Sequence, residues 1–171
     1  KERLGNPPPR IAEAPGCMLN AIGLQNPGVD YFIEHDLPWL KEQGTIVIAN
    51  IAGNTPEEYC AMAEKLSDTN VDMLEMNISC PNVKEGGVQF GTSCMGVEQI
   101  TAAVRKHCTK PLMVKLSPNV TDIGDIAASA EAGGADAISM INTLTGMRID
   151  IQTRRPIIRN NTGGVSGPAL L

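Results

Sequence analysis

Amides and one ammonium group stand where the short apolar runs of this sequence stop. A carboxamide offers two hydrogen-bond donors and two acceptor lone pairs. Several of them around one pocket would suit a planar ring with alternating carbonyl and N–H groups, such as a pyrimidinedione or a flavin. Asparagine is also common at strand ends simply because it tolerates turn geometry. The residues concerned are Asn20, Asn50, Asn77, Lys115 and the pair Asn142-Thr143.

Lys115 lies inside an apolar run, between Val114 and Leu116. A buried ammonium group is unfavourable unless it is paired or meets an anion. One interpretation is that Lys115 stabilises negative charge on a bound electron sink. The alternative is a lysine at the sheet edge whose stem lies on apolar surface while its ammonium reaches water.

Cys80 follows the apolar run that ends at Asn77, and Pro81 comes directly after it. A thiol just beyond a strand, on a loop that contains Gly86-Gly87, suits a reactive nucleophile or a proton acceptor. We expect the other thiols to be inert and mostly buried, and we expect both histidines to be structural. No cysteine pair has C-x-x-C spacing, so no disulfide framework and no metal site is predicted. The residues expected to be inert or structural are Cys17, Cys60, Cys94, Cys108, His35 and His107.

Strand-like runs must position these residues. Short β-branched or apolar runs cover residues 45–49, 73–78, 112–116 and 137–141, and helical patterns lie between them. Thr55 followed by Pro56 and two carboxylates predicts the start of a helix that reaches residue 67. Further helices are predicted over 95–106 and from about Ile123 to Gly133-Gly134, where glycine ends the helix. This alternation is typical of a parallel sheet with crossover helices.

The repeat favours a parallel (βα)8 barrel over a dinucleotide-binding fold. No G-x-G-x-x-G follows a strand, and in a barrel the carboxyl ends of the strands converge on one face, where active sites are built. A closed barrel needs roughly 250 residues, whereas the chain has 171. Further strands are expected near Met18-Leu19 and after Arg159. We therefore expect residues 1–171 to be an internal part of a single barrel domain whose N-terminal and C-terminal portions are missing.

Composition narrows the classes of protein. The chain is 42% hydrophobic and 19% charged, which permits a buried core and argues against a wholly disordered chain. Its 14 basic and 19 acidic residues give a formal net charge of −5, and aromatic residues make up only 3%. Both features disfavour nucleic-acid binding. No run approaches the roughly 20 apolar residues of a membrane span, no leader is apparent, and free thiols indicate a reducing cytoplasm.

Five segments together resemble class 1 dihydroorotate dehydrogenases, and the resemblance covers essentially the whole chain. The segments at residues 3–10 and 84–91 are most similar to the 1B subclass. The five motifs are Leu19-Asn20-Ala21-Ile22-Gly23-Leu24-Gln25-Asn26, Asn77-Ile78-Ser79-Cys80-Pro81-Asn82, Val114-Lys115-Leu116-Ser117-Pro118-Asn119, Ile141-Asn142-Thr143 and Gly163-Gly164-Val165-Ser166-Gly167-Pro168.

This resemblance implies an FMN enzyme of pyrimidine biosynthesis that oxidises dihydroorotate to orotate on a (βα)8 barrel. Cys80 would remove a proton from C5 while a hydride leaves C6 for the flavin N5. Lys115 would lie near N1 and O2 of the flavin, where an ammonium group stabilises negative charge. The implied substrate-binding residues are Asn20, Ala21, Ile22, Gly23, Leu24, Asn77, Asn82, Asn142 and Thr143. The implied FMN contacts are Asn50, Asn77, Lys115, Ile141 and Gly167.

The 1B resemblance also implies partners. In that subclass electrons leave through a second subunit that carries FAD and an iron–sulfur cluster, with NAD as the acceptor. The five cysteines of this chain lack the spacing of cluster ligands, so the cluster would belong to the partner subunit. A homo-oligomer is also expected.

The family has a lysine before the start of this chain, and glycine-containing phosphate loops after its end. We therefore expect the chain by itself to bind FMN weakly and to show little activity. Two alternatives stay open. One is the pyrimidine-binding domain of dihydropyrimidine dehydrogenase, which would prefer dihydrouracil as reductant. The other is a non-catalytic fragment whose exposed edges serve association.

Overall fold

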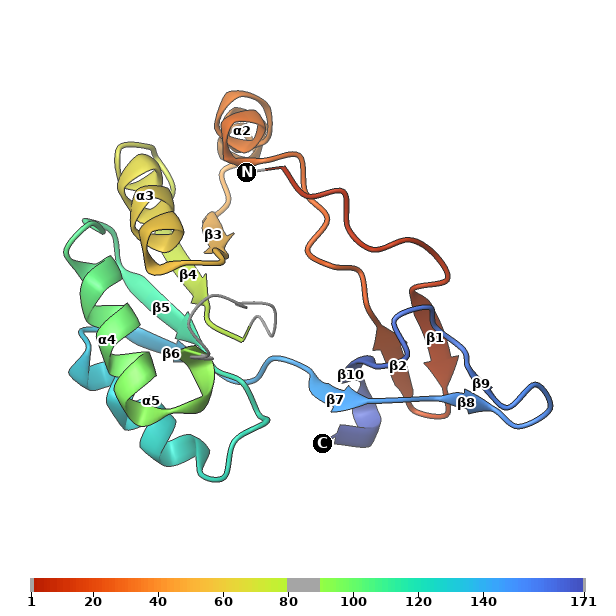
Figure 1. The fold of residues 1–171 in the computed structure, drawn as a ribbon. Coiled ribbons are helices and arrows are strands. Elements are labelled where there is room, and N and C mark those ends of the chain that lie inside the picture. The colour runs from red at the N-terminus through yellow and green to blue at the C-terminus, as the bar shows by residue number, and fades with distance from the viewer. Residues whose placement is uncertain (1, 80–89, 171) are drawn as a thin grey trace. The chain divides into compact units, whose positions relative to one another are not determined.

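The computed structural model describes residues 2–79 and 90–170 of the chain (Figure 1). It divides into two compact units. One unit comprises residues 33–142. The other is formed by the two ends of the chain, up to Phe32 and from Thr143 onward. The units are described separately.

The central unit is built on a parallel sheet in the order β3-β4-β5-β6. The strands are β3 (Ile48–Ile51), β4 (Met73–Asn77), β5 (Leu112–Lys115) and β6 (Ala137–Ser139). The helices α3 (Pro56–Ser67), α4 (Cys94–Arg105) and α5 (Ile123–Ala132) connect successive strands, with η2 (Phe90–Thr92) before α4 (Figure 1). A helical segment of α1 (Val29–Tyr31), η1 (Phe32–Asp36) and α2 (Leu37–Glu42) precedes β3, and the division between the two units falls within it, after Phe32. The predicted parallel α/β arrangement is confirmed, and the four strands form an open sheet among the described residues.

Side-chain caps begin the three connecting helices. The Thr55 side chain accepts a hydrogen bond from the backbone N–H of Glu58 at 3.3 Å, directly before Pro56. Ser93 receives the N–H of Gly96 at 3.2 Å, and Asp122 receives that of Gly124 at 2.7 Å. Each cap satisfies a backbone donor that the first helical turn leaves unpaired. The predicted helix boundaries are confirmed to within a residue or so, whereas the first strand was predicted three residues too early.

The two faces of the parallel sheet differ in character. Leu74, Met76, Leu112 and Val114 are all 0% exposed. Helices pack on one face of the sheet (Figure 1), and we assign these four buried side chains to that face because of their burial. Successive strand residues point to opposite faces. The residues that follow each of these four in the strands therefore lie on the other face. Three of them are polar or charged and one is apolar: Glu75, Asn77, Lys115 and Met113.

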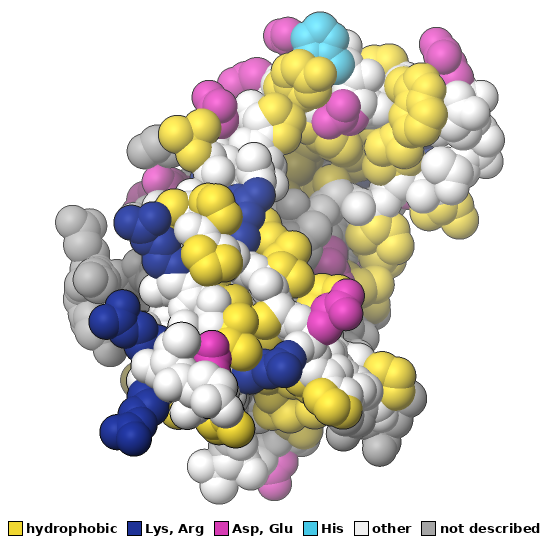
Figure 2. Space-filling model, turned by 90° about the vertical axis from the view of Figure 1, so that its right-hand side faces the viewer, with side chains coloured by type: hydrophobic (Ala, Val, Ile, Leu, Met, Phe, Trp, Pro, Cys, Tyr) yellow, Lys and Arg dark blue, Asp and Glu magenta, His cyan; other side chains and the backbone are white. Residues whose placement is uncertain are grey.

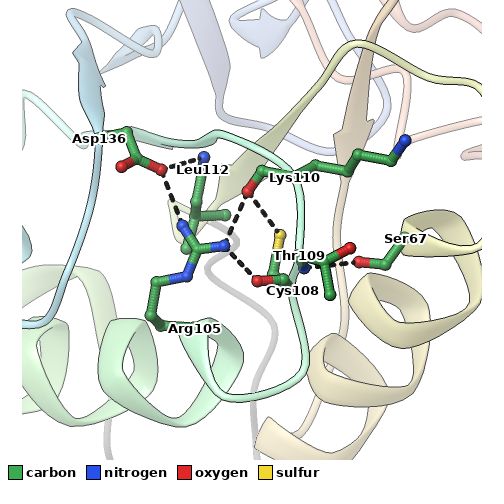
Figure 3. A network of polar contacts seen from close by, with 7 residues as sticks. All are labelled: Ser67, Arg105, Cys108, Thr109, Lys110, Leu112 and Asp136. Carbon is green, nitrogen blue, oxygen red and sulfur yellow. Dashed lines mark hydrogen bonds and ion pairs between the residues drawn. The ribbon is translucent and has the colours of Figure 1, made fainter.

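At the amino-terminal ends of the strands, an aspartate that precedes one strand accepts a backbone N–H from the start of the neighbouring strand. This arrangement, here called a polar staple, occurs twice, and Figure 3 shows the one made by Asp136. Asp136 accepts hydrogen bonds from the backbone N–H of Leu112 and from Arg105 Nη1, both at 2.7 Å. Arg105 Nη2 also donates to the Lys110 carbonyl at 2.7 Å and to the Cys108 carbonyl. Each such acidic residue directly precedes a strand and ties it to the start of its neighbour.

Asp72 makes the same arrangement earlier in the central unit, directly before β4. Its carboxylate accepts from the Val47 N–H at 2.7 Å and from Lys41. The hydrogen bond from Lys41, then that from Val47, holds the pKa of Asp72 below its ordinary value of 3.8. The same polar staple links β4 to β3 and β6 to β5. The strands are therefore fixed to one another at their amino-terminal ends.

The second unit is an antiparallel sheet in the order β1-β2-β10-β7. Its strands are β1 (Ile11–Ala14), β2 (Cys17–Asn20), β7 (Leu144–Gly146) and β10 (Gly163–Ser166). Ala12, Leu19 and Ile158 form its small buried core. The strands expected near Met18-Leu19 and after Arg159 therefore exist, but their assignment to the parallel barrel was wrong. A two-residue hairpin turn at Pro15-Gly16 joins β1 to β2, and such a turn can join only antiparallel strands.

A hairpin of β8 (Ile149–Asp150) and β9 (Arg155–Pro156) extends this unit, and η3 (Pro168–Leu170) follows β10. Figure 2 views the face that carries the hairpin, where Lys and Arg side chains gather with hydrophobic side chains between them. Ile149 and Ile151 are 54% and 82% exposed. Asp150 caps the hairpin loop by accepting the N–H groups of Gln152 and Thr153, and these hydrogen bonds lower its pKa.

Among the described residues, no helix is both long and apolar enough to cross a bilayer. No group of three or more His, Cys, Asp or Glu side chains in residues 2–79 and 90–170 is arranged to hold a metal ion.

Candidate functional site

Asn77 is the centre of a polar cluster at the carboxyl end of β4. Its side chain is nearly buried, at 7% exposure. The Oδ1 atom accepts hydrogen bonds from the backbone N–H of Ser79 at 3.2 Å and from Asn142 Nδ2 at 3.1 Å. Two amides predicted from the sequence, 65 residues apart, are thus brought together as expected.

Lys115 lies beside Asn77 on the same face of the sheet. It is paired in register with Asn77 on one side and with Ser139 on the other. Its side chain is half-buried, yet within the described residues it forms no hydrogen bond and no ion pair. An ammonium group in this position is available to an anionic or electron-rich ligand.

Asn50 occupies a different place from the one expected. It lies inside β3 rather than beyond its end, and its Nδ2 donates to Glu75 Oε2 at 2.5 Å. Asn50 and Glu75 are paired in register, so both lie on the polar face with Asn77 and Lys115. The position within the strand was misjudged because the apolar run before Asn50 begins three residues earlier than the strand does.

Three further residues of this cluster were not predicted. Glu75 could have been found from its alternation with Asn77, since residues two apart in a strand share a face. Ser79 Oγ is buried and has no hydrogen-bond partner in the described part of the chain. Tyr59, a buried residue of α3, donates from its hydroxyl to the Asn77 carbonyl at 2.6 Å; nothing in the sequence distinguishes it from an ordinary core residue.

Asn20 and Thr143 both lie next to Gly164 in the other unit. Asn20 Nδ2 donates to the Gly164 carbonyl at 3.4 Å. A Cβ atom on Gly164 would lie only 2.1 Å from Thr143 Oγ1, so glycine is required there for the two segments to approach. Asn20 ends an antiparallel strand, which corrects the expectation that it ends a strand of the parallel sheet.

Residues 21–24 follow β2 as a hydrogen-bonded loop. The Ala21 N–H donates to the Arg10 carbonyl at 2.8 Å, and Asn6 Nδ2 donates to the Ala21 carbonyl at 2.9 Å. The Ile22 carbonyl accepts the Asn6 N–H at 2.9 Å. Gly23 has a φ of +77° and lies against Asn6, a position where a side chain would collide. This segment is therefore held in one shape by Asn6.

Four predicted site residues remain, and the structure describes two of them, Ile141 and Gly167. Ile141 is 46% exposed and precedes Asn142 in the central unit. Gly167 has a φ of +130°, and a Cβ atom there would lie 2.8 Å from Cys17 Cα, so the position requires glycine. Cys80 and Asn82 lie outside the described residues.

The other thiols only partly follow the prediction. Cys108 is buried and Cys17 and Cys60 are half-buried, but Cys94 is exposed at the first position of α4. Burial, followed by the nearby Glu57 and Glu64, raises the pKa of the Cys60 thiol, which disfavours its reactive thiolate form. His35 and His107 are exposed, and His107 Nδ1 lies 3.7 Å from Glu64 Oε2. Neither histidine joins the polar cluster.

The comparisons with known proteins agree on one family. The sequence model of dihydroorotate dehydrogenase matches residues 1–171. A protein of Alkaliphilus metalliredigens named dihydroorotate dehydrogenase B (NAD(+)), catalytic subunit, is 62% identical over 97% of this chain and 55% of its own length. Relatives with the same name in Geobacillus kaustophilus and Citrifermentans bemidjiense are 57% and 56% identical, over 98% and 99% of this chain and 54% and 56% of their own lengths. The chain thus spans about half the length of these relatives.

Proposed function

The chain belongs to the dihydroorotate dehydrogenase family, and we propose that the protein oxidises dihydroorotate to orotate with FMN as its cofactor in pyrimidine biosynthesis. The observation that carries this proposal is the cluster of Asn77, Asn142 and Lys115 at the carboxyl end of a parallel sheet. Amide donors and acceptors beside a cation that has no partner among the described residues match the edge of a heterocycle that carries carbonyl and N–H groups and accumulates negative charge.

The residues of the central unit fit FMN on two observations. The Lys115 ammonium has no anionic partner among the described residues, and Ser79 Oγ is a buried hydroxyl without a hydrogen bond there. A polar ligand with negative charge would give the ammonium group a partner and the hydroxyl a hydrogen bond. We propose Asn50, Asn77, Lys115 and Ile141 of this unit as FMN contacts, together with Gly167 of the other unit. When bound, FMN supplies the acceptor for the hydride that leaves the substrate.

The protein's own residues bind the substrate and move its proton. In this proposal Cys80 accepts the proton from C5 of dihydroorotate, so its thiolate is the working form. Asn142 Nδ2 donates to Asn77 Oδ1, and this hydrogen bond would hold the two amides in a fixed relation beside the substrate. The proposed substrate contacts are Asn20, the backbone of Ala21, Ile22, Gly23 and Leu24, together with Asn77, Asn82, Asn142 and Thr143.

We propose further that the parallel sheet is part of a (βα)8 barrel, because the curated relatives are about twice as long as this chain and the barrel places active sites at the carboxyl ends of its strands. The relatives are named as catalytic subunits that use NAD(+). Accordingly, a second subunit with FAD and an iron–sulfur cluster would pass electrons to NAD, and the protein would work as a homo-oligomer in the cytoplasm.

The choice of reductant tests the function. The full-length protein, loaded with FMN and kept anaerobic, is mixed with dihydroorotate or with dihydrouracil, and the flavin absorbance is followed. Dihydroorotate should bleach the flavin and dihydrouracil should not, because only dihydroorotate carries a carboxylate. Preferential bleaching by dihydrouracil would favour a dihydropyrimidine dehydrogenase-like activity, and no bleaching by either would indicate a non-catalytic role.

A further inference from the structure

Tyr59 makes a buried contact that packing alone does not explain. It lies on α3 and is 1% exposed, and its hydroxyl donates to the backbone carbonyl of Asn77 at 2.6 Å. The ring belongs to the helix layer, whereas the carbonyl belongs to the last residue of β4. The hydroxyl therefore ties the helix to the point at which this strand leaves the sheet.

Asn77 lies where the pairing of β4 with its neighbours ends. The pairing with β3 stops at Met76 and Ile51, and the pairing with β5 stops at Asn77 and Lys115. A buried backbone carbonyl without a hydrogen bond is strongly unfavourable. The Tyr59 hydroxyl gives the Asn77 carbonyl a hydrogen bond from α3, so the last residue of β4 is held by a side chain in addition to its pairing with β5.

Two glycines fit the chain around this contact. A Cβ atom on Gly53 would lie 3.1 Å from Tyr59 Cδ2, so the absence of a side chain leaves room for the tyrosine ring. A Cβ atom on Gly91 would lie 2.4 Å from the Ile78 carbonyl, which shows how closely residues 90–91 pack on the residue after Asn77. The exit of β4 is thus held from the helix side and from the returning chain.

We infer that Tyr59 is a positioning residue that fixes the orientation of Asn77 in the site. Asn77 accepts hydrogen bonds at two atoms. Its backbone carbonyl accepts one from the Tyr59 hydroxyl, and its Oδ1 accepts one from the Ser79 N–H and one from Asn142 Nδ2. A shift of that carbonyl would move the side chain and both of its partners. The catalytic consequence of this inference rests on the proposed function, whereas the structural link does not.

The substitution Tyr59→Phe removes the hydroxyl and keeps the ring. Val104→Ala is the matched control, because Val104 is 0% exposed and lies on α4, outside the contacts described above. Both variants are made in the full-length protein. Hydrogen–deuterium exchange of the FMN-free protein, read at the Ser79 amide, reports whether Asn77 Oδ1 still holds that N–H.

We expect Tyr59→Phe to speed exchange at Ser79 by about tenfold, which corresponds to the loss of one hydrogen bond. We expect Val104→Ala to change the exchange rate at Ser79 by no more than its effect on the free energy of unfolding of the whole protein accounts for. In the FMN-loaded protein, Tyr59→Phe should slow flavin reduction by dihydroorotate by about tenfold and have no further effect once Asn77→Ala is present, because coupled residues are not additive.

Unchanged exchange at Ser79, or equal effects of Tyr59→Phe with and without Asn77→Ala, would overturn the inference. If dihydroorotate does not reduce the flavin of the unmodified protein, the proposed function fails, and the exchange measurement alone then decides whether Tyr59 positions Asn77. The two failures are therefore distinguishable.

Discussion

At the scale of single residues, Asn77 and Lys115 carry most of the account. Asn77 is nearly buried and uses both its carbonyl and its side-chain oxygen within the protein, and its amide N–H groups have no partner among the described residues. Lys115 is its neighbour across the ladder and has no partner among the described residues. A rigid amide beside an available cation is the preorganised electrostatic arrangement that stabilises charge as it develops.

Cys80 carries the first prediction at this scale. Cys80→Ala should lower the rate of flavin reduction by dihydroorotate by about two to four orders of magnitude, the usual contribution of a general base, and should leave orotate affinity nearly unchanged. Because an ordinary thiol titrates near ~8.5, the unmodified protein should reduce its flavin faster as pH rises toward that value. Anaerobic stopped-flow absorbance measures both effects.

Cys60→Ala provides the matched control for this measurement. Cys60 lies on α3, where burial raises the pKa of its thiol, and it has no role in the proposed chemistry. Its replacement should leave the rate and its pH dependence unchanged. A normal reduction rate in Cys80→Ala would remove Cys80 from the mechanism.

At the scale of elements, local signals and long-range pairing had different outcomes. Helix starts were predictable because Thr55 and Pro56 act within one turn of the chain. The pairing of β10 with β2 was not, since it joins segments 144 residues apart through two four-residue strands that carry little pattern, and β10 begins with two glycines. Asn20 was therefore assigned to the wrong kind of sheet, although it and Thr143 both lie next to Gly164.

The site shows the same division. The amides and Lys115 were found from the sequence because they interrupt apolar runs. Tyr59 was missed because its hydroxyl is recognisable only once the carbonyl of Asn77 lies opposite it. Cys94 was expected to be buried, yet the first position of α4 leaves it exposed.

Asp72 carries a prediction for the staples of the parallel sheet. Asp72→Ala removes the acceptor of both the Val47 N–H and Lys41 and should lower the melting temperature at neutral pH by about 2–5 °C. Folding lowers the pKa of Asp72, so its stabilisation is present above the ordinary carboxyl pKa and is lost as pH falls through the lowered value.

Thermal unfolding between neutral and acidic pH measures this difference. The melting temperatures of Asp72→Ala and of the unmodified protein should converge in acid. Glu98→Ala is the control, because Glu98 is an exposed acidic residue of α4 with no hydrogen bond or ion pair in the described structure. A constant difference at all pH values, or an equal effect of Glu98→Ala, would contradict the staple.

At the scale of the whole molecule, the two units differ in the cores that support them. The central unit buries large side chains on strands and helices alike, including Leu74, Leu112 and Val114 at 0% exposure. The antiparallel unit relies on Ala12, Leu19 and Ile158 with a few half-buried neighbours. Because burial of apolar surface is the main stabilising contribution, the central unit should be the more stable of the two.

Native-state hydrogen exchange tests that difference. The amides of β4 and β5, which each have a strand on both sides, should exchange slowest, and those of β1, β2 and β10 should exchange faster through local opening. Slower exchange in β2 than in β4 would show that the small core is the more stable one.

The most direct test of the account is the position of the bound ligands. A crystal structure of the full-length protein with FMN and orotate should place Lys115 Nζ and the Asn77 side chain within hydrogen-bonding distance of the flavin or the orotate ring. A flavin bound away from the carboxyl ends of β4 and β5 would contradict the central claim that this polar face of the sheet is the catalytic site.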